Sequence, residues 1–127
     1  MKFVRYEDFS KIPNLLTVEV ACQIYESIFS LKEDIELAKL LEELINLAVD
    51  YANIRSRWLT MSAQQTVQMN EIRSQYHDFF IASINNLSRY MYLHGYENTW
   101  ANLLGDDRKR IGDFACYITY IQAINAR

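Results

Sequence analysis

The stretch that decides the fold runs from Ser62 to Gly95, SAQQTVQMNEIRSQYHDFFIASINNLSRYMYLHG, and contains no glycine or proline before its last residue. Ser62 and Gln65 have the spacing of a capping box, in which each side chain satisfies a backbone N–H of the first helical turn. Gly95 is the residue type that most readily forms a left-handed C-cap. Apolar side chains recur between these ends at helical steps: Met69, Ile72, Tyr76, Phe80, Ile84, Leu87, Tyr90 and Met91. The sequence therefore predicts one helix of about 45 Å, at 1.5 Å per residue.

A second long helix is predicted directly before it. Ser30 and Glu33 match another capping box, so we expect a helix from Ser30 to about Leu59. Its buried stripe is Leu37, Leu41, Leu44, Ala48, Tyr51 and Trp58, widened by Leu40, Leu47 and Ile54. Its outer face carries five acids, which is typical of a solvated surface: Glu33, Asp34, Glu36, Glu42 and Glu43. A compact globule of this length has a radius of gyration of about 14 Å. Each of the two predicted helices is longer than such a globule is wide, so we expect them to form an elongated antiparallel hairpin.

A shorter helix is predicted on the N-terminal side of the hairpin. Pro13 disfavours helix at the preceding residue and Asn14 can act as an N-cap, so we expect a helix from Leu15 to Phe29. Its buried stripe is Val18, Ala21, Cys22, Tyr25, Ile28 and Phe29. The opening stretch, Met1 to Pro13, reads as a short helix or an ordered arm.

Two more helical segments follow the hairpin. A single turn is expected between Gly95 and Gly105, capped by Asn98 or Thr99. A terminal helix, capped by Asp106 or Asp107, has the stripe Ile111, Phe114, Ala115, Ile118 and Ile121, broadened by Tyr117, Tyr120 and Ile124. Gly112 lies inside this helix, where glycine costs about 1 kcal/mol relative to alanine, and we expect it to permit close packing. The predicted fold class is all-α: an elongated antiparallel hairpin with shorter N- and C-terminal helices, packed as a four- to five-helix bundle.

Composition agrees with one helical domain over residues 1–127. Half of the 127 residues are hydrophobic and 23% are charged, which excludes disorder. A chain of this length buries roughly two thirds of its unfolded surface and supports one core. The scarcity of turn residues, with one proline and three glycines, excludes an all-β fold.

Charge and cysteine usage restrict the partners. The chain has 13 basic and 16 acidic residues and no basic stripe, which speaks against general nucleic-acid binding. Cys22 and Cys116 form no CxxC pair and are too few for a disulfide framework, so we expect a reducing, cytoplasmic location. No uncharged run approaches 18 apolar residues and none resembles a signal peptide, so no membrane partner is expected.

The sequence predicts no catalytic residue, metal or cofactor. The two histidines, His77 and His94, lie on one predicted helix at about 25 Å by rise, too far apart to share a metal. Both cysteines fall on predicted buried stripes, where a thiol packs as a small apolar side chain. No Walker A, GxGxxG or HExxH motif is present.

Arg73 and His77 form the first candidate binding site. They are one turn apart at the edge of the apolar stripe. A long cation at such a boundary usually extends its charge to solvent or pairs with an acid on the neighbouring helix. The alternative is an anion or carboxylate pocket, with Arg73 as a planar fork of donors and His77 as a pH-sensitive donor.

Trp100, Arg108 and Arg110 form the second candidate, around the run Asp106-Asp-Arg-Lys-Arg110. Acids followed by bases at a helix start balance their own charge, and capping accounts for Asp106 or Asp107. The alternative is that Arg108, Lys109 and Arg110 together bind a phosphate or an acidic partner surface, with Trp100 stacking on a base where the partner is a nucleic acid.

Aromatic content favours a protein partner. The chain has nine tyrosines and two tryptophans, and the helical stripes cannot bury all of them: Tyr6, Trp58, Tyr92, Tyr96 and Trp100 compete for the interior. Tyrosine, tryptophan and arginine are enriched at binding hot spots. This pattern indicates recognition of another protein, or self-association along the long helices.

The C-terminal third of the chain contains a pattern made up of Arg73, His77, Asn85, Leu87, Arg89, Gly95, Trp100 and the run Arg110-Ile-Gly-Asp-Phe-Ala115. This pattern resembles a family of small all-helical bacterial proteins with no assigned function. The resemblance implies a bacterial, cytosolic origin and transfers no functional residue.

Three functions remain open at this point. The first is a non-enzymatic, regulatory or immunity-type protein-interaction module, with homo-oligomers among its forms. The second is a small-molecule or nucleotide-binding protein, with an enzyme among its forms, that uses Arg73 and His77, with Arg110 as a third candidate. The third is nucleic-acid binding through Arg108 to Arg110 with Trp100 stacking, which the net charge of −3 disfavours.

Overall fold

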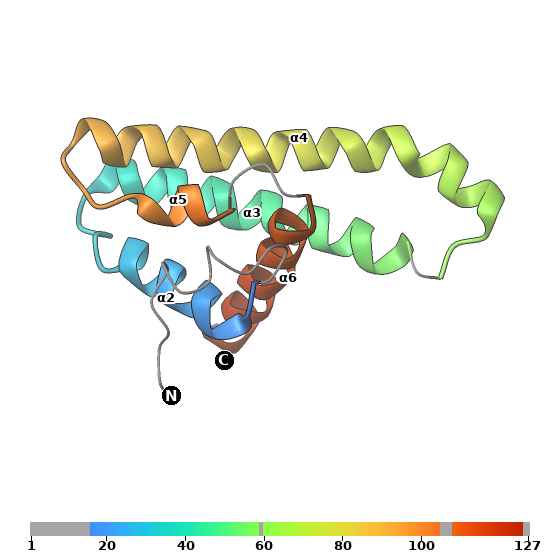
Figure 1. The fold of residues 1–127 in the computed structure, drawn as a ribbon, viewed down its shortest axis with the longest axis horizontal. Helices are drawn as coiled ribbons and strands as arrows, with labels where there is room; N and C mark the ends of the chain where they lie inside the picture. Colours follow the sequence, from blue (N-terminus) through green and yellow to red (C-terminus); the bar gives the residue numbers. More distant parts are fainter. Residues whose placement is uncertain (1–15, 59, 105–107, 126–127) are drawn as a thin grey trace.

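The structure is a computed structural model that describes residues 16–58, 60–104 and 108–125. Within these ranges the chain forms five helices and no strand: α2 (Val18–Phe29), α3 (Ile35–Trp58), α4 (Ala63–Leu93), α5 (Thr99–Leu104) and α6 (Arg108–Asn125). Figure 1 shows a helical bundle in which α2, α5 and α6 pack along the α3–α4 hairpin. The predicted all-α class is confirmed. The segment Met1 to Pro13 and the caps proposed for Asn14, Asp106 and Asp107 lie outside the described residues.

The hairpin of α3 and α4 forms as predicted. Its two helices run antiparallel, side by side over most of their length (Figure 1). At the start of α4, the Gln65 backbone N–H donates to Ser62 Oγ at 3.2 Å and the Ser62 N–H donates to Gln65 Oε1 at 2.9 Å. Gly95 follows the helix with φ of +75°, the left-handed conformation expected of it. Both predicted ends of this helix are confirmed.

The start predicted for α3 is wrong. Ser30 ends α2 instead of opening the next helix, because its backbone N–H donates to Glu26 O at 2.9 Å. The chain then turns, and Asp34 N–H donates to Leu31 O at 3.0 Å. Asp34 takes the capping role, since its Oδ1 accepts from Leu37 N–H at 3.2 Å. A tight turn that reverses the chain therefore replaces the first helical turn expected from the capping box.

Helix α2 is shorter than predicted and rotated. Its N-cap is Thr17, whose side chain accepts from Val20 N–H at 3.3 Å. The buried positions are Val20, Ala21, Ile24, Tyr25 and Ile28, while Phe29 is exposed and Cys22 is half-buried. Because α2 is apolar around most of its circumference, periodicity alone did not select the face that packs.

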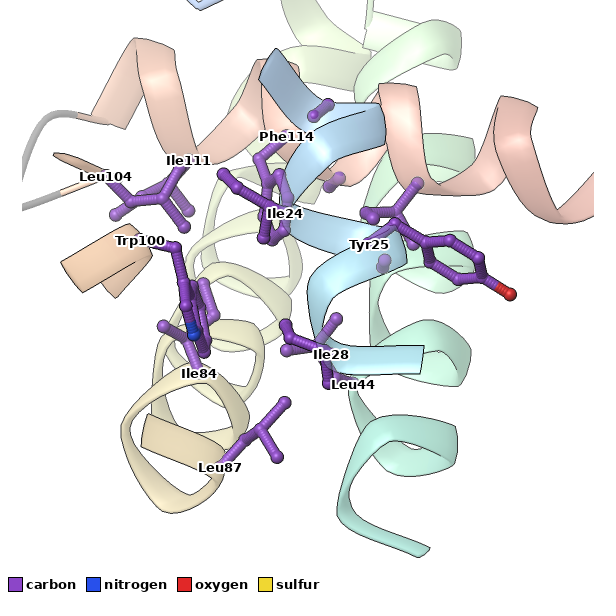
Figure 2. Packing of buried hydrophobic residues seen from close by; sticks show 14 of the residues in the cluster. Ile24, Tyr25, Ile28, Leu44, Ile84, Leu87, Trp100, Leu104, Ile111 and Phe114 are labelled. Atoms are coloured by element: carbon purple, nitrogen blue, oxygen red, sulfur yellow. The ribbon is translucent and has the colours of Figure 1, made fainter. Parts of the chain in front are cut away.

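The core draws side chains from all five helices (Figure 2). The ring of Phe80 on α4 lies between Tyr51 on α3, at a centroid distance of 6.2 Å, and Phe114 on α6, at 6.1 Å. Trp100 on α5 is completely buried against this cluster. The five stripe positions predicted for α6, from Ile111 to Ile121, are all buried.

The hairpin extends beyond the bundle at its connecting end (Figure 1). Among the described residues 53–57 and 60–76, no side chain is buried. We call this part the hairpin tip. Of the helices described, none is long and apolar enough to cross a membrane.

Candidate functional site

His77 is one of the residues singled out from the sequence, and α4 places it in the packed interface with α3. It is only 6% exposed, and its ring meets Tyr51 edge-on with centroids 5.5 Å apart. Nδ1 lies 3.4 Å from Asp78 Oδ1. Nε2 is buried and accepts or donates no hydrogen bond among the described residues. His77 therefore belongs to the edge of the core.

Arg73 and Arg110, the proposed anion-binding partners of His77, occupy packing positions as well. Arg73 is half-buried one turn before His77 on α4. Arg110 is 9% exposed, and its Nη1 donates to the carbonyl oxygen of Leu103 at 2.6 Å. Leu103 lies in the last turn of α5, where carbonyl groups lack helical partners. Arg110 therefore satisfies the end of α5 from the neighbouring helix α6.

Trp100 is 0% exposed, which places it in the core and not on a surface. The ring is thus unavailable for stacking on a nucleic-acid base, and the expectation that it contacts a partner is corrected. The reason is that α5 packs beside α4, where the side-chain amide of Asn98 donates to Ser88 O at 3.2 Å. The side chain of Arg108 lies outside the described residues.

An ion-pair cluster that the sequence did not reveal joins α3 to α6. Arg55 Nη1 donates to Asp113 Oδ1 at 2.9 Å and lies 3.7 Å from Cys116 Sγ, while Lys109 Nζ donates to Asp113 Oδ2 at 3.1 Å. Burial is the largest single effect and lowers the pKa of Arg55, but the hydrogen bonds and charge interactions with Asp113 and Cys116 together outweigh it, so the pKa is raised. A Cβ on Gly112 would lie 2.8 Å from Arg55 Cζ. The close packing predicted at Gly112 is therefore a contact with the guanidinium group of Arg55.

A second cluster ties the α2–α3 turn to the end of α4. Tyr90 Oη donates to Asp34 Oδ1 at 2.8 Å, and Tyr96 Oη donates to Asp34 Oδ2 at 2.9 Å. The hydrogen bond to Asp34 raises the pKa of Tyr90 to about 12, and the same bond lowers the pKa of Asp34. Both clusters satisfy their charged groups within the fold. They act as joints between helices and offer no open coordination position.

The largest cavity among those described is a groove between α2 and α6, with a volume of about 820 Å³. Its walls are mainly apolar: Val18, Cys22, Tyr25, Glu26 and Phe29 from α2, and Tyr120, Ile121 and Ile124 from α6. Three of these large side chains stand partly in solvent, with Phe29 41%, Tyr120 60% and Ile124 45% exposed. We call this cavity the α2–α6 groove. Its size falls within the range of roughly 300–1,000 Å³ that is typical of ligand sites.

Two smaller cavities lie elsewhere on the described surface. One of about 400 Å³ lies on the α3 side of α2 and shares Tyr25 and Phe29 with the α2–α6 groove. These two rings stack with centroids 5.5 Å apart and form the ridge between the two hollows. The other, of about 390 Å³, lies on the hairpin beside Phe79. None of the three described cavities has Arg73, His77 or Arg110 in its wall.

The sequence contained one signal for the groove. Tyr120 and Ile124 made the apolar stripe of the terminal helix broader than one packing partner requires, and Phe29 did the same for α2. In the part of the chain that the structure describes, no group of three His, Cys, Asp or Glu side chains is placed to hold a metal ion.

Comparisons with protein-family models, with curated proteins and with solved structures each found no match to this chain. The resemblance of the C-terminal third to small helical bacterial proteins therefore stays a prediction. What supports a function is the chemistry of the surface that the described residues form.

Proposed function

We propose that the protein is a non-enzymatic, cytosolic helical interaction module of the regulatory or immunity type, which recognises another protein through the α2–α6 groove. The observation that carries this proposal is the apolar groove itself, walled by three partly exposed large side chains, Phe29, Tyr120 and Ile124. Contiguous exposed apolar surface marks interaction sites, and a groove between two helices is a common receptor for a peptide segment.

The free energy of burying apolar side chains favours a protein partner over solvent in this groove. Fully burying a large apolar side chain contributes about 1.5–3 kcal/mol, so three half-exposed side chains leave a comparable free energy unused. Single exposed apolar residues elsewhere, such as Val67 at 77%, are ordinary on protein surfaces. The groove differs because its exposed residues are neighbours around one cavity.

The small-molecule alternative receives less support. It required Arg73, His77 and Arg110 to share an open pocket, whereas Arg110 is engaged with the Leu103 carbonyl group and His77 packs edge-on against Tyr51. A packing role accounts for both contacts. We therefore propose the interaction module alone.

A matched pair of double variants tests the proposal. The groove variant, Tyr120→Ser with Ile124→Ser, removes two exposed side chains from the α6 wall of the groove. The control variant, Val67→Ser with Leu93→Ser, removes two apolar side chains that are 77% and 69% exposed outside it. All four positions are exposed, so both variants should fold with stability within about 0.5 kcal/mol per site of the original.

The readout is partner retention and self-association. Affinity capture from the native lysate, followed by mass spectrometry, should recover a protein with the original chain and with the control variant but not with the groove variant. Sedimentation velocity of each purified protein tests whether that partner is a second copy. Identical behaviour of the groove and control variants in both measurements would contradict the proposed function.

A further inference from the structure

The length of the α2–α6 groove suits a helical segment. Its α2 wall extends from Val18 to Phe29, eleven steps along the helix axis and thus about 16 Å at 1.5 Å per residue. A helix laid along this wall can present side chains at i, i+4, i+7 and i+11, the pattern by which amphipathic helices fill apolar grooves. The facing wall from Tyr120 to Ile124 covers one turn of α6, so the middle anchors would be enclosed most tightly.

Along the groove, the charged residues on the described helices that form its walls come from α2 and are negative. Helix α2 contains two charged residues, Glu19 and Glu26, and the part of α6 from Phe114 to Asn125 contains none. Lys32 lies beside the groove residue Phe29, and its Nζ is 4.5 Å from the centroid of the Phe29 ring and thus engaged in a cation–π contact.

The local electrostatic effect is visible at Cys22, which lines the groove. Burial raises the pKa of the Cys22 thiol, and the carboxylates of Glu26 and then Glu19 raise it further. A thiol that is made harder to ionise by two acids lies in a negative potential. The net charge of the chain, −3, has the same sign and would steer a basic partner towards it.

From this geometry and charge we infer that the occupant of the α2–α6 groove is an amphipathic helix of another protein, apolar on one face and lined with lysine or arginine beside that face. The inference rests on the proposed function and specifies the chemistry of its partner. A second copy fits less well, because a two-fold interface brings the same patch of both copies together and would place the acids Glu19 and Glu26 of both copies in one interface. An anionic ligand meets the same repulsion.

Two designed peptides test the inference on the full-length protein. Each has about 18 residues, above the length at which isolated helices become stable, and each carries leucine at i, i+4, i+7 and i+11. One has lysine at the positions beside the leucine face, and its twin has glutamate there. Fluorescence anisotropy should show the lysine peptide binding at least about tenfold more tightly than the glutamate twin at low ionic strength. This preference should shrink as salt is added.

Protein variants assign the effect to the groove. The double variant Glu19→Gln with Glu26→Gln should reduce the preference for the lysine peptide, because it removes both carboxylates of α2, Glu26 in the groove wall and Glu19 next to the wall residue Val18. The groove variant should weaken both peptides, whereas the control variant should bind each as the original protein does.

The results separate this inference from the proposed function. Equal binding of both peptides, tighter binding of the glutamate twin, or no binding of either overturns the basic helix as occupant. A dimer that dissociates in the groove variant also overturns it and assigns the groove to a second copy. If the groove variant still loses a captured partner that the control variant keeps, the proposed function survives these failures. If the two variants behave alike in every measurement, both ideas fail.

Discussion

The two ends of the α3–α4 hairpin are made of similar helix but are held in different ways. At the covered end, α2, α5 and α6 bury side chains of both helices, including Leu44 and Phe80, which are 0% exposed. At the hairpin tip, the described residues 53–57 and 60–76 bury none. The covered end therefore depends on tertiary packing. The described residues of the tip contact the bundle only through half-buried side chains such as Arg55 and Tyr76, so local hydrogen bonds such as the Ser62 capping box contribute more to it.

The comparison also bears on function. The tip projects without a cavity of its own among those described, while the α2–α6 groove lies where two short helices cover each other incompletely. An element that is only partly covered leaves apolar surface for a partner. Variants at the covered end and at the tip should therefore differ in their effects on stability.

The largest effect is expected from Phe80→Ala. The Phe80 ring is 0% exposed and lies between Tyr51 and Phe114, so its removal leaves a cavity and should cost about 3–5 kcal/mol of unfolding free energy. Its neighbour Phe79 is 52% exposed and provides the matched control, with an expected cost under about 1 kcal/mol. Urea denaturation of both variants gives the comparison. Similar losses for the two would show that the core is not where the structure has it.

A smaller and more local effect is expected at the tip from Ser62→Ala. Loss of this N-cap should cost about 1 kcal/mol of helix stability. Because residues 63–76 bury no side chain, the loss should appear as faster amide hydrogen exchange there. Amides near Phe80 should exchange as before. Uniformly faster exchange along α4 would contradict a tip that opens independently of the bundle.

Gly112→Ala tests the joint between the base of the tip and α6. In a protein that also carries Arg55→Ala, the new methyl group should stabilise α6 by up to about 1 kcal/mol through helix propensity. With Arg55 present that gain should vanish, because the methyl group displaces the guanidinium from Asp113. A double-mutant cycle by denaturation measures this coupling. Equal stabilisation in both backgrounds would show that the Arg55 guanidinium group does not pack against Gly112.

The smallest effect on stability is expected from the Asp34–Tyr90 joint at the covered end, and it depends on pH. The pKa of Tyr90 is raised to about 12, so its contribution is present below the ordinary tyrosine pKa of about 10 and is lost as pH rises towards 12. The pKa of Asp34 is lowered, so its contribution is present above about pH 4 and is lost as pH falls through the folded value.

Tyrosinate absorbance measures this joint directly. The difference between the original protein and Tyr90→Phe should reveal a tyrosine that titrates near pH 12. In an Asp34→Asn background the same difference should move down to the ordinary range, because the acceptor carboxylate is gone. A Tyr90 titration that ignores Asp34→Asn would show that the hydrogen bond does not form in solution.

The sequence predicted the helices well where local signals were unopposed. Ser62 and Ser30 both begin capping-box patterns, yet only Ser62 begins a helix, because Ser30 is hydrogen-bonded into the end of α2. Sequence spacing describes possible local bonds. It does not show which of two neighbouring helices will include the residue.

The candidate site was less predictable, because it depends on how separate helices meet. Trp100 was predicted to lie at the surface, but α5 places it in the core. Phe29 was predicted to be buried, but it is exposed on α2. The pairing of Arg55 with Asp113 spans 58 positions, and no local pattern encodes it. The groove arises from the same kind of contact, between α2 near the start of the chain and α6 near its end.

Nuclear magnetic resonance mapping can locate the surface on which a basic amphipathic helix binds. When the lysine peptide is titrated into the isotope-labelled protein, we expect saturable shifts for Val18, Cys22, Ile121 and Ile124 in the α2–α6 groove, with Val67 at the tip unchanged. Shifts that gather on the tip or beside Phe79, with the groove signals unmoved, would contradict binding in the groove.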